Sequence, residues 1–144
     1  MDLRRLFDDL VRFETELWNG IDARLQRECG VSMGGLDVLS VVARVPGCRV
    51  NDIAGALSIT VGGASQAVDR LAAAGRLVRR PNPADRRSSL VELTPQGARL
   101  TEEAGRVFDE ELAGRFRGVL ADGDLDRLGT VLAALRAGPA HPRA

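Results

Sequence analysis

A cluster of arginines in the middle of the chain carries the strongest chemical signal. Between Thr60 and Leu90 there are six arginines and two aspartates, a local charge of +4 in a chain of 144 residues whose net charge is zero. Guanidinium groups bind phosphates through charge-assisted hydrogen bonds and enter the electronegative minor groove of duplex DNA. Exposed charges act over only about 10 Å in salt, so the cluster favours a local contact with a polyanion. The arginines are Arg70, Arg76, Arg79, Arg80, Arg86 and Arg87.

The residues from Thr60 to Arg70 have the composition of a helix face that reads DNA. Hydroxyl and amide side chains in this segment can hydrogen-bond phosphates or base edges. Gly62 and Gly63 each cost a helix roughly 1 kcal/mol relative to alanine. Close approach of backbone N–H groups to a phosphate would offset that cost, and a poorly formed helix start is the other explanation. The expected outward residues are Thr60, Val61, Gly62, Gly63, Ser65, Gln66, Asp69 and Arg70.

Local signals define the elements that must position these groups. Asn51 and Thr60 are predicted to cap two successive short helices, and Gly75 to end the second of them. Leu77–Arg80 and Ser89–Leu93 are short β-strand candidates. A helix, a turn, a second helix and a hairpin, in that order, form a winged helix-turn-helix, in which the second helix enters the major groove.

The predicted hairpin carries charge at its tip. Residues 81–85, Pro-Asn-Pro-Ala-Asp, are typical of a turn and lead directly into Arg86 and Arg87. An arginine on a thin wing can enter the minor groove, and we expect the Asp85 carboxylate to hold the Arg87 guanidinium by a charge-assisted bond. A solvated charged loop is the alternative. The predicted DNA contacts of the hairpin are Arg79, Asp85, Arg86 and Arg87.

Amphipathic helices flank this central segment. One apolar seam, Leu3, Leu6, Leu10, Phe13 and Leu17, runs along the first helix at alternating spacings of three and four, beside a second stripe. The second stripe is Phe7, Val11, Trp18, Ile21 and Leu25. After the central segment, the sequence predicts a long helix capped by Thr94 and a break at 121–123. A last helix follows, with the apolar residues Leu125, Leu128, Leu132 and Leu135.

The predicted fold is therefore mainly α with a small β-wing. We expect a winged helix-turn-helix lobe over residues 31–95, between dimerisation helices at residues 1–30 and 96–144, in one intertwined domain. Two helical ends with unpaired apolar seams predict a homodimer.

Several function classes find no support in the sequence. The single histidine, His141, is far from Cys29 and Cys48, so no metal site, catalytic group or cofactor site is expected. No stretch reaches 18 apolar residues, and the N-terminus lacks the apolar core of a signal peptide. We therefore expect a cytoplasmic protein that is not an enzyme and does not contact a membrane.

The ordered motifs resemble the MarR family of transcriptional regulators. The resemblance rests on residues 57–60, 68–71, 75–80 and 82–87 and on Leu93-Thr94-Pro95-Gln96-Gly97. It implies a homodimer on a pseudo-palindromic duplex operator, usually a repressor, relieved by a small aromatic ligand or by thiol oxidation. Asp85 and Arg87 match the family's wing pair, whereas Gly62-Gly63 replaces the larger polar residues of many members.

The resemblance also suggests where a ligand would bind and leaves two alternatives open. Trp18, Asp22, Met33 and Leu36 are the candidate residues of a pocket for the aromatic effector, although a tryptophan on an apolar stripe also suits a core. Arginines near Cys48 would lower its thiol pKa, so a thiol-based redox sensor is one alternative. A winged-helix module that binds a protein partner is the other.

Overall fold

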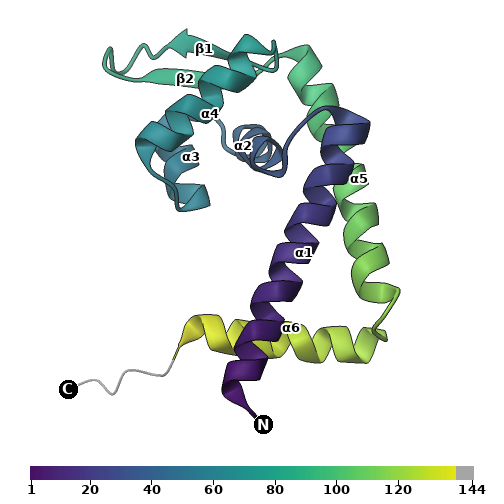
Figure 1. Cartoon of the computed structure of the whole chain (residues 1–144). Helices are drawn as coiled ribbons and strands as arrows, with labels where there is room; N and C mark the ends of the chain where they lie inside the picture. The colour runs from purple at the N-terminus through teal and green to yellow at the C-terminus, as the bar shows by residue number, and fades with distance from the viewer. Residues whose placement is uncertain (139–144) are drawn as a thin grey trace, which may run out of the picture. The chain divides into compact units, whose positions relative to one another are not determined.

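The computed structural model describes residues 1–138 and divides the chain into two compact units, with the boundary in α5 between Phe108 and Asp109. Figure 1 shows the elements in chain order. The first unit holds α1 (Leu3–Cys29), α2 (Met33–Arg44), α3 (Val50–Leu57), α4 (Val61–Ala73), β1 (Leu77–Pro81), β2 (Ser89–Leu93) and the start of α5 (Pro95–Arg117). The second holds the rest of α5 and α6 (Asp122–Ala137). The predicted mainly helical fold with a small β-wing is confirmed; His141 lies outside the described residues.

Side-chain caps define the helix starts as the sequence predicted. Thr60 Oγ1 accepts a hydrogen bond from the Gly63 N–H at 3.0 Å, and Ser32 and Thr94 cap α2 and α5 in the same way. Gly75 follows α4 with a left-handed φ of +76°, which suits glycine. The hydroxyl caps satisfy N–H groups that the helices leave unpaired.

The predicted starts of two helices are wrong by one or two residues. Asn51 does not cap α3, because the helix already begins at Val50 and the Asp52 carboxylate accepts from the Arg49 N–H at 2.8 Å. The break before the last helix lies between Arg117 and Asp122, so that Asp122 is already helical. Its carboxylate, in the first turn of α6, is favoured by the positive end of the helix dipole.

The core of the first unit lies where α2, α3 and α4 meet the hairpin. Leu39, Ile53, Val68 and Val91 are each at most 2% exposed and come from four different elements. Each such side chain contributes about 1.5–3 kcal/mol relative to an exposed position. From α1, only Ile21 and Leu25 are buried. The core therefore fixes the orientation of α4 and leaves the N-terminal turns of α1 outside it.

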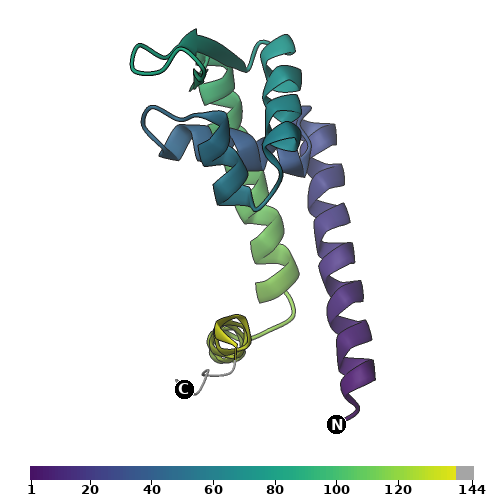
Figure 2. The same cartoon turned by 90° about the vertical axis from the view of Figure 1, so that its left-hand side faces the viewer.

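The hairpin pairs antiparallel, with Leu77 opposite Leu93 and Arg79 opposite Val91. Cross-strand partners share one face of a sheet, so Arg79 lies on the same face as the buried Leu77 and Val91. Figures 1 and 2 both show the hairpin beside α3 and α4. The Val91 N–H also donates to the Cys48 carbonyl at 2.7 Å, which anchors the segment before α3 to the sheet.

Candidate nucleic-acid interface

The N-terminal half of α4 presents small and polar residues to solvent. Ala64, Val68 and Leu71 are buried, so the opposite face of the helix must point outward. Val61 on that face is 53% exposed, and no atom lies within 4 Å of where a side chain on Gly62 would begin. The exposed predicted contact residues of this segment are Thr60, Val61, Gly62, Gln66, Asp69 and Arg70; Gly63 and Ser65 are half-buried.

Arg79 joins α4 to the wing. Its Nη2 donates to Asp69 Oδ1 at 2.9 Å and to Ser65 Oγ at 3.0 Å, both on α4. Its Nη1 donates to Ser89 Oγ on β2 at 3.2 Å. The guanidinium is directed toward the protein because β1 places Arg79 on the face that packs against α4. The sequence prediction that Arg79 contacts DNA stays a prediction.

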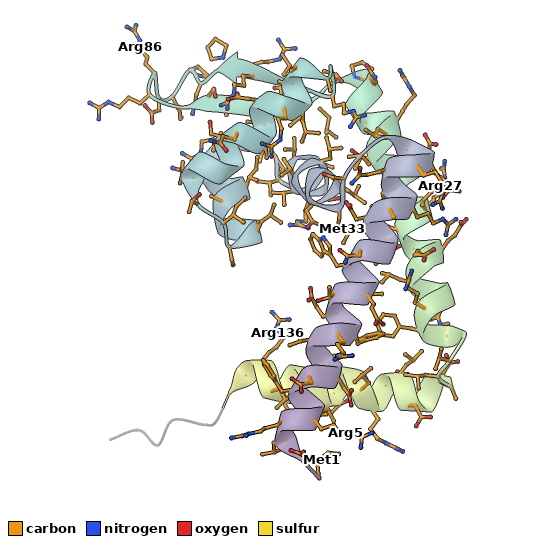
Figure 3. The ribbon with its side chains drawn as sticks, in the orientation of Figure 1. Met1, Arg5, Arg27, Met33, Arg86 and Arg136 are labelled. Atoms are coloured by element: carbon orange, nitrogen blue, oxygen red, sulfur yellow. The ribbon has the colours of Figure 1, made fainter. Side chains whose placement is uncertain are left out.

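The wing tip is shaped by hydrogen bonds to its backbone. Asp85 Oδ1 accepts from the Arg87 backbone N–H at 2.9 Å, whereas we expected this carboxylate to hold the Arg87 guanidinium. An aspartate side chain is short enough to accept a hydrogen bond from the backbone N–H two residues further on. In this turn, Oδ1 of Asp85 is therefore bonded to the backbone of Arg87. Asn82 Nδ2 also donates to Ser88 Oγ at 3.0 Å across the loop. Arg86 projects from the tip, as Figure 3 shows.

A small polar groove lies between the start of α3, α4 and the wing. It has a volume of about 220 Å³. The lining residues are Arg49, Val50, Asn51, Val61, Ser65, Arg79, Arg87, Ser88 and Ser89. Sequence reasoning missed five residues of this surface, which are Arg49, Val50, Asn51, Ser88 and Ser89. Arg49 reaches it because an isolated β-bridge pairs it with Leu90, a contact that no local pattern predicts.

A larger, mostly apolar cleft of about 690 Å³ opens on another side of α4. Trp18 of α1 lines it, together with Leu57, Arg70 and other residues of α2 and α4. Of the other predicted pocket residues, Met33 and Leu36 are buried in the core, and none of Asp22, Met33 and Leu36 lines this cleft. The assignment of those residues to a ligand pocket stays a prediction.

Asp22 and Asp37 differ in their surroundings. Asp22 Oδ1 accepts from the Met33 N–H at 2.7 Å, so this carboxylate ties α1 to the start of α2. Asp37 lines the apolar cleft, and burial raises the pKa of its carboxyl above the ordinary value of 3.8. The cleft therefore contains an acid that is costly to ionise, and Arg70 and Arg76 line the same cleft.

The surroundings of both cysteines oppose thiolate formation. Burial raises the pKa of the Cys48 thiol, and the charge of Asp52 raises it further. Burial also raises the pKa of Cys29, with Glu103 and Glu28 adding to the effect. The expectation that nearby arginines lower the Cys48 pKa is therefore wrong, because the sulfur is buried while Arg49 is directed toward solvent and Asp52.

No helix in the described part of the chain is long and apolar enough to cross a membrane. Within residues 1–138, no three or more His, Cys, Asp or Glu side chains are grouped to hold a metal ion.

The helix pair, the buried core behind it and the paired hairpin define a winged helix-turn-helix protein. Residues 30–88, which include α4 and the wing tip, match the MarR family, the family that the sequence motifs resemble. The HTH-type transcriptional regulator BilQ of Clostridium symbiosum is 32% identical over 88 residues, 61% of this chain. The chain spans 60% of the length of that relative.

Solved structures share the fold over nearly the whole chain. A MarR family transcriptional regulator from Streptomyces coelicolor, in complex with DNA, aligns with a TM-score of 0.84 at 22% identity and covers 98% of this chain and 90% of that one. CouR from Rhodococcus jostii, bound to p-coumaroyl-CoA, aligns with a TM-score of 0.73 at 23% identity, covering 93% and 92% of the two chains. The winged-helix prediction is thereby confirmed.

Proposed function

We propose that this protein is a transcriptional regulator that binds duplex DNA with α4 in the major groove and the wing in the adjacent minor groove. The observation that carries the proposal is the exposed face of α4. The first residues of α4 offer little side-chain bulk, and Gln66 supplies a donor and an acceptor one turn further on. A recognition helix uses its N-terminal residues in this way to reach base edges.

The wing supports the same docking. Asp85 and Asn82 hold the loop by hydrogen bonds, and the guanidinium of Arg87 has no hydrogen-bond or ion-pair partner among residues 1–138. A positively charged side chain on a shaped loop suits the minor groove and the backbone phosphates along its edge. Arg86 projects from the same tip.

The regulator acts as a homodimer on a pseudo-palindromic operator and represses transcription. Apolar side chains stay exposed along α1 and, separately, along α6, including Leu3 at 74% and Leu135 at 65%. Contiguous apolar surface of this kind is unusual on a monomer, and a second copy of the chain would cover it. Two recognition helices would then meet half-sites about 34 Å apart on one face of the duplex.

A small aromatic acid relieves repression by binding in the cleft that Trp18 lines. The cleft has the volume of a small-molecule site, an apolar lining and the arginines Arg70 and Arg76 at its wall. Since Arg70 and Gly63 belong to α4, a ligand there would act directly on the recognition helix. It shifts DNA affinity only if it binds the two arrangements of the helix unequally.

Selection of bound duplexes from a random pool tests the proposal. We expect enrichment of a two-fold symmetric sequence, bound by a dimer with an affinity that falls steeply with salt. Repeating the selection with aromatic acids tests the effector, and Trp18 fluorescence reports its binding. Failure to enrich any duplex, with a protein partner captured instead, would support the protein-interaction alternative. Sensitivity of binding to oxidant would support the redox alternative.

A further inference from the structure

The groove between α4 and the wing concentrates groups that bind phosphate. Three arginines line it, one from the segment before α3, one from β1 and one from the wing: Arg49, Arg79 and Arg87. Hydroxyl groups of three serines, Ser65, Ser88 and Ser89, line it as well. Arginine and serine are among the usual ligands of DNA phosphates.

The proposed docking brings a DNA strand to this groove. When α4 occupies the major groove and the wing the neighbouring minor groove, one sugar-phosphate strand separates them. That strand must cross between α4 and the wing, where the groove lies. We propose that the groove is a seat for one backbone phosphodiester, with Arg49 and Arg87 as its ligands. This inference rests on the proposed function and adds residues that the sequence did not suggest.

The three arginines have different roles in this seat. Arg79 donates to Asp69 and Ser65 of α4 and to Ser89 of β2, and its side chain is 31% exposed. It is therefore a positioning residue that holds α4 and the wing together beneath the seat. The Arg87 guanidinium has no protein partner within residues 1–138 and is available to an anion.

Arg49 is the second available ligand. Its side chain is 46% exposed, and only its Nε lies near a carboxylate, 3.6 Å from Asp52 Oδ2. A loose, exposed pair of this kind contributes little, so the terminal nitrogens can turn to a phosphate at small cost. The other nearby carboxylate, Asp69, is already paired with Arg79. The three arginines outnumber the carboxylates of Asp52 and Asp69 by one, so the seat keeps a net charge of +1.

The seat fixes the register of the protein on the duplex. A phosphate held by groups from three elements requires the wing and α4 to keep the spacing that Arg79 sets. Phosphate contacts carry no sequence information themselves, but they position the helix that reads the bases. Loss of the seat should therefore weaken binding to every duplex.

Ethylation interference on a duplex selected from the random pool tests the seat. Ethylation neutralises and enlarges single phosphates, so wild-type protein should reject duplexes modified at the seated position. Arg49→Gln should weaken interference at one position in each half-site and keep it elsewhere. Its salt slope should fall in magnitude by less than about 2 for the dimer, because Arg87 still contacts the seated phosphate of each protomer.

The matched control is Arg27→Gln, since Arg27 is also exposed and lies at the end of α1, away from α4 and the wing in Figure 3. It should keep the wild-type pattern and slope. Ser88→Ala, a smaller change in the same groove, should weaken interference at the same position as Arg49→Gln. Thermal unfolding confirms that each variant folds.

The phosphate seat would be overturned if the Arg49→Gln protein folds, binds the duplex and keeps both the wild-type interference pattern and the wild-type salt slope. The proposed function would still stand after that result. Absence of any selected duplex for the wild type would overturn the proposed function, and the seat with it.

Discussion

Gly62 occupies a helical position where alanine would stabilise the protein. It is the second residue of α4, and no atom lies within 4 Å of the point that an added Cβ would occupy. Alanine is favoured over glycine in a helix by up to about 1 kcal/mol, and nothing in the fold opposes that gain. Gly63 differs, because its Cβ would lie 3.1 Å from the Thr60 Oγ1 that caps the helix. Gly62 therefore has no structural reason to remain glycine.

We expect Gly62→Ala to raise the free energy of unfolding by up to about 1 kcal/mol and to weaken duplex binding. The added methyl group would separate the helix N-terminus from the phosphate or base that it approaches. Loss of one charge-assisted hydrogen bond costs about 1.5–3 kcal/mol, which is roughly tenfold or more in affinity per half-site. Urea unfolding and fluorescence anisotropy with the selected duplex measure the two effects.

Gly105→Ala is the control, since Gly105 lies within α5 and also has no atom within 4 Å of the added Cβ. It should stabilise the protein and leave duplex affinity unchanged. A Gly62→Ala protein that is more stable and binds the duplex as tightly as wild type would refute the reasoning, because the glycine would then serve no close approach.

Three further predictions concern the wing, the cleft and base recognition. Asp85→Ala should weaken duplex binding by opening the turn that Asp85 Oδ1 closes on the Arg87 N–H, whereas Asp85→Asn keeps an acceptor and should restore affinity in anisotropy titrations. Burial raises the pKa of Asp37, so the native state retains the carboxyl proton above pH 3.8, and wild-type stability falls as pH rises through the raised pKa. Urea unfolding at several pH values should show that Asp37→Asn abolishes this fall. Val61, 53% exposed, should contact a thymine methyl group, so replacing that thymine by uracil should cost wild type about 0.8 kcal/mol per half-site and cost Val61→Ala less.

Local chemistry made much of this fold predictable. The hydroxyls of Thr60 and Thr94 accept hydrogen bonds from N–H groups three residues further on. The glycine after α4 adopts the left-handed backbone conformation, and the proline at the start of α5 has no N–H group that needs a partner. Such signals depend on neighbours in sequence, so they can be read without knowing the tertiary structure. The turn residues 81–85 likewise separated the two strand candidates, which pair as β1 and β2.

Other features depend on contacts between distant segments and were not predictable. The contacts of Arg79 with Ser65 and Asp69 of α4 follow from its strand register, which the sequence does not show. Arg49 reaches the groove beside α4 through its bridge to Leu90. Burial likewise decided the Cys48 pKa, because the identity of neighbours in sequence says little about how deeply a sulfur lies.

Base reading by α4 and backbone contact by the wing are tested most directly by one salt titration of duplex affinity. Wild type, Gln66→Ala and Arg87→Ala are titrated on the selected duplex and on a scrambled one. Arg87→Ala should weaken binding to both duplexes and lower the magnitude of the log–log slope by about 2 per dimer. Gln66→Ala should keep the slope and lose roughly 1–3 kcal/mol of preference per contact for the selected duplex. An unchanged slope in Arg87→Ala together with lost sequence preference, or a Gln66→Ala protein with full preference, would contradict the assigned roles.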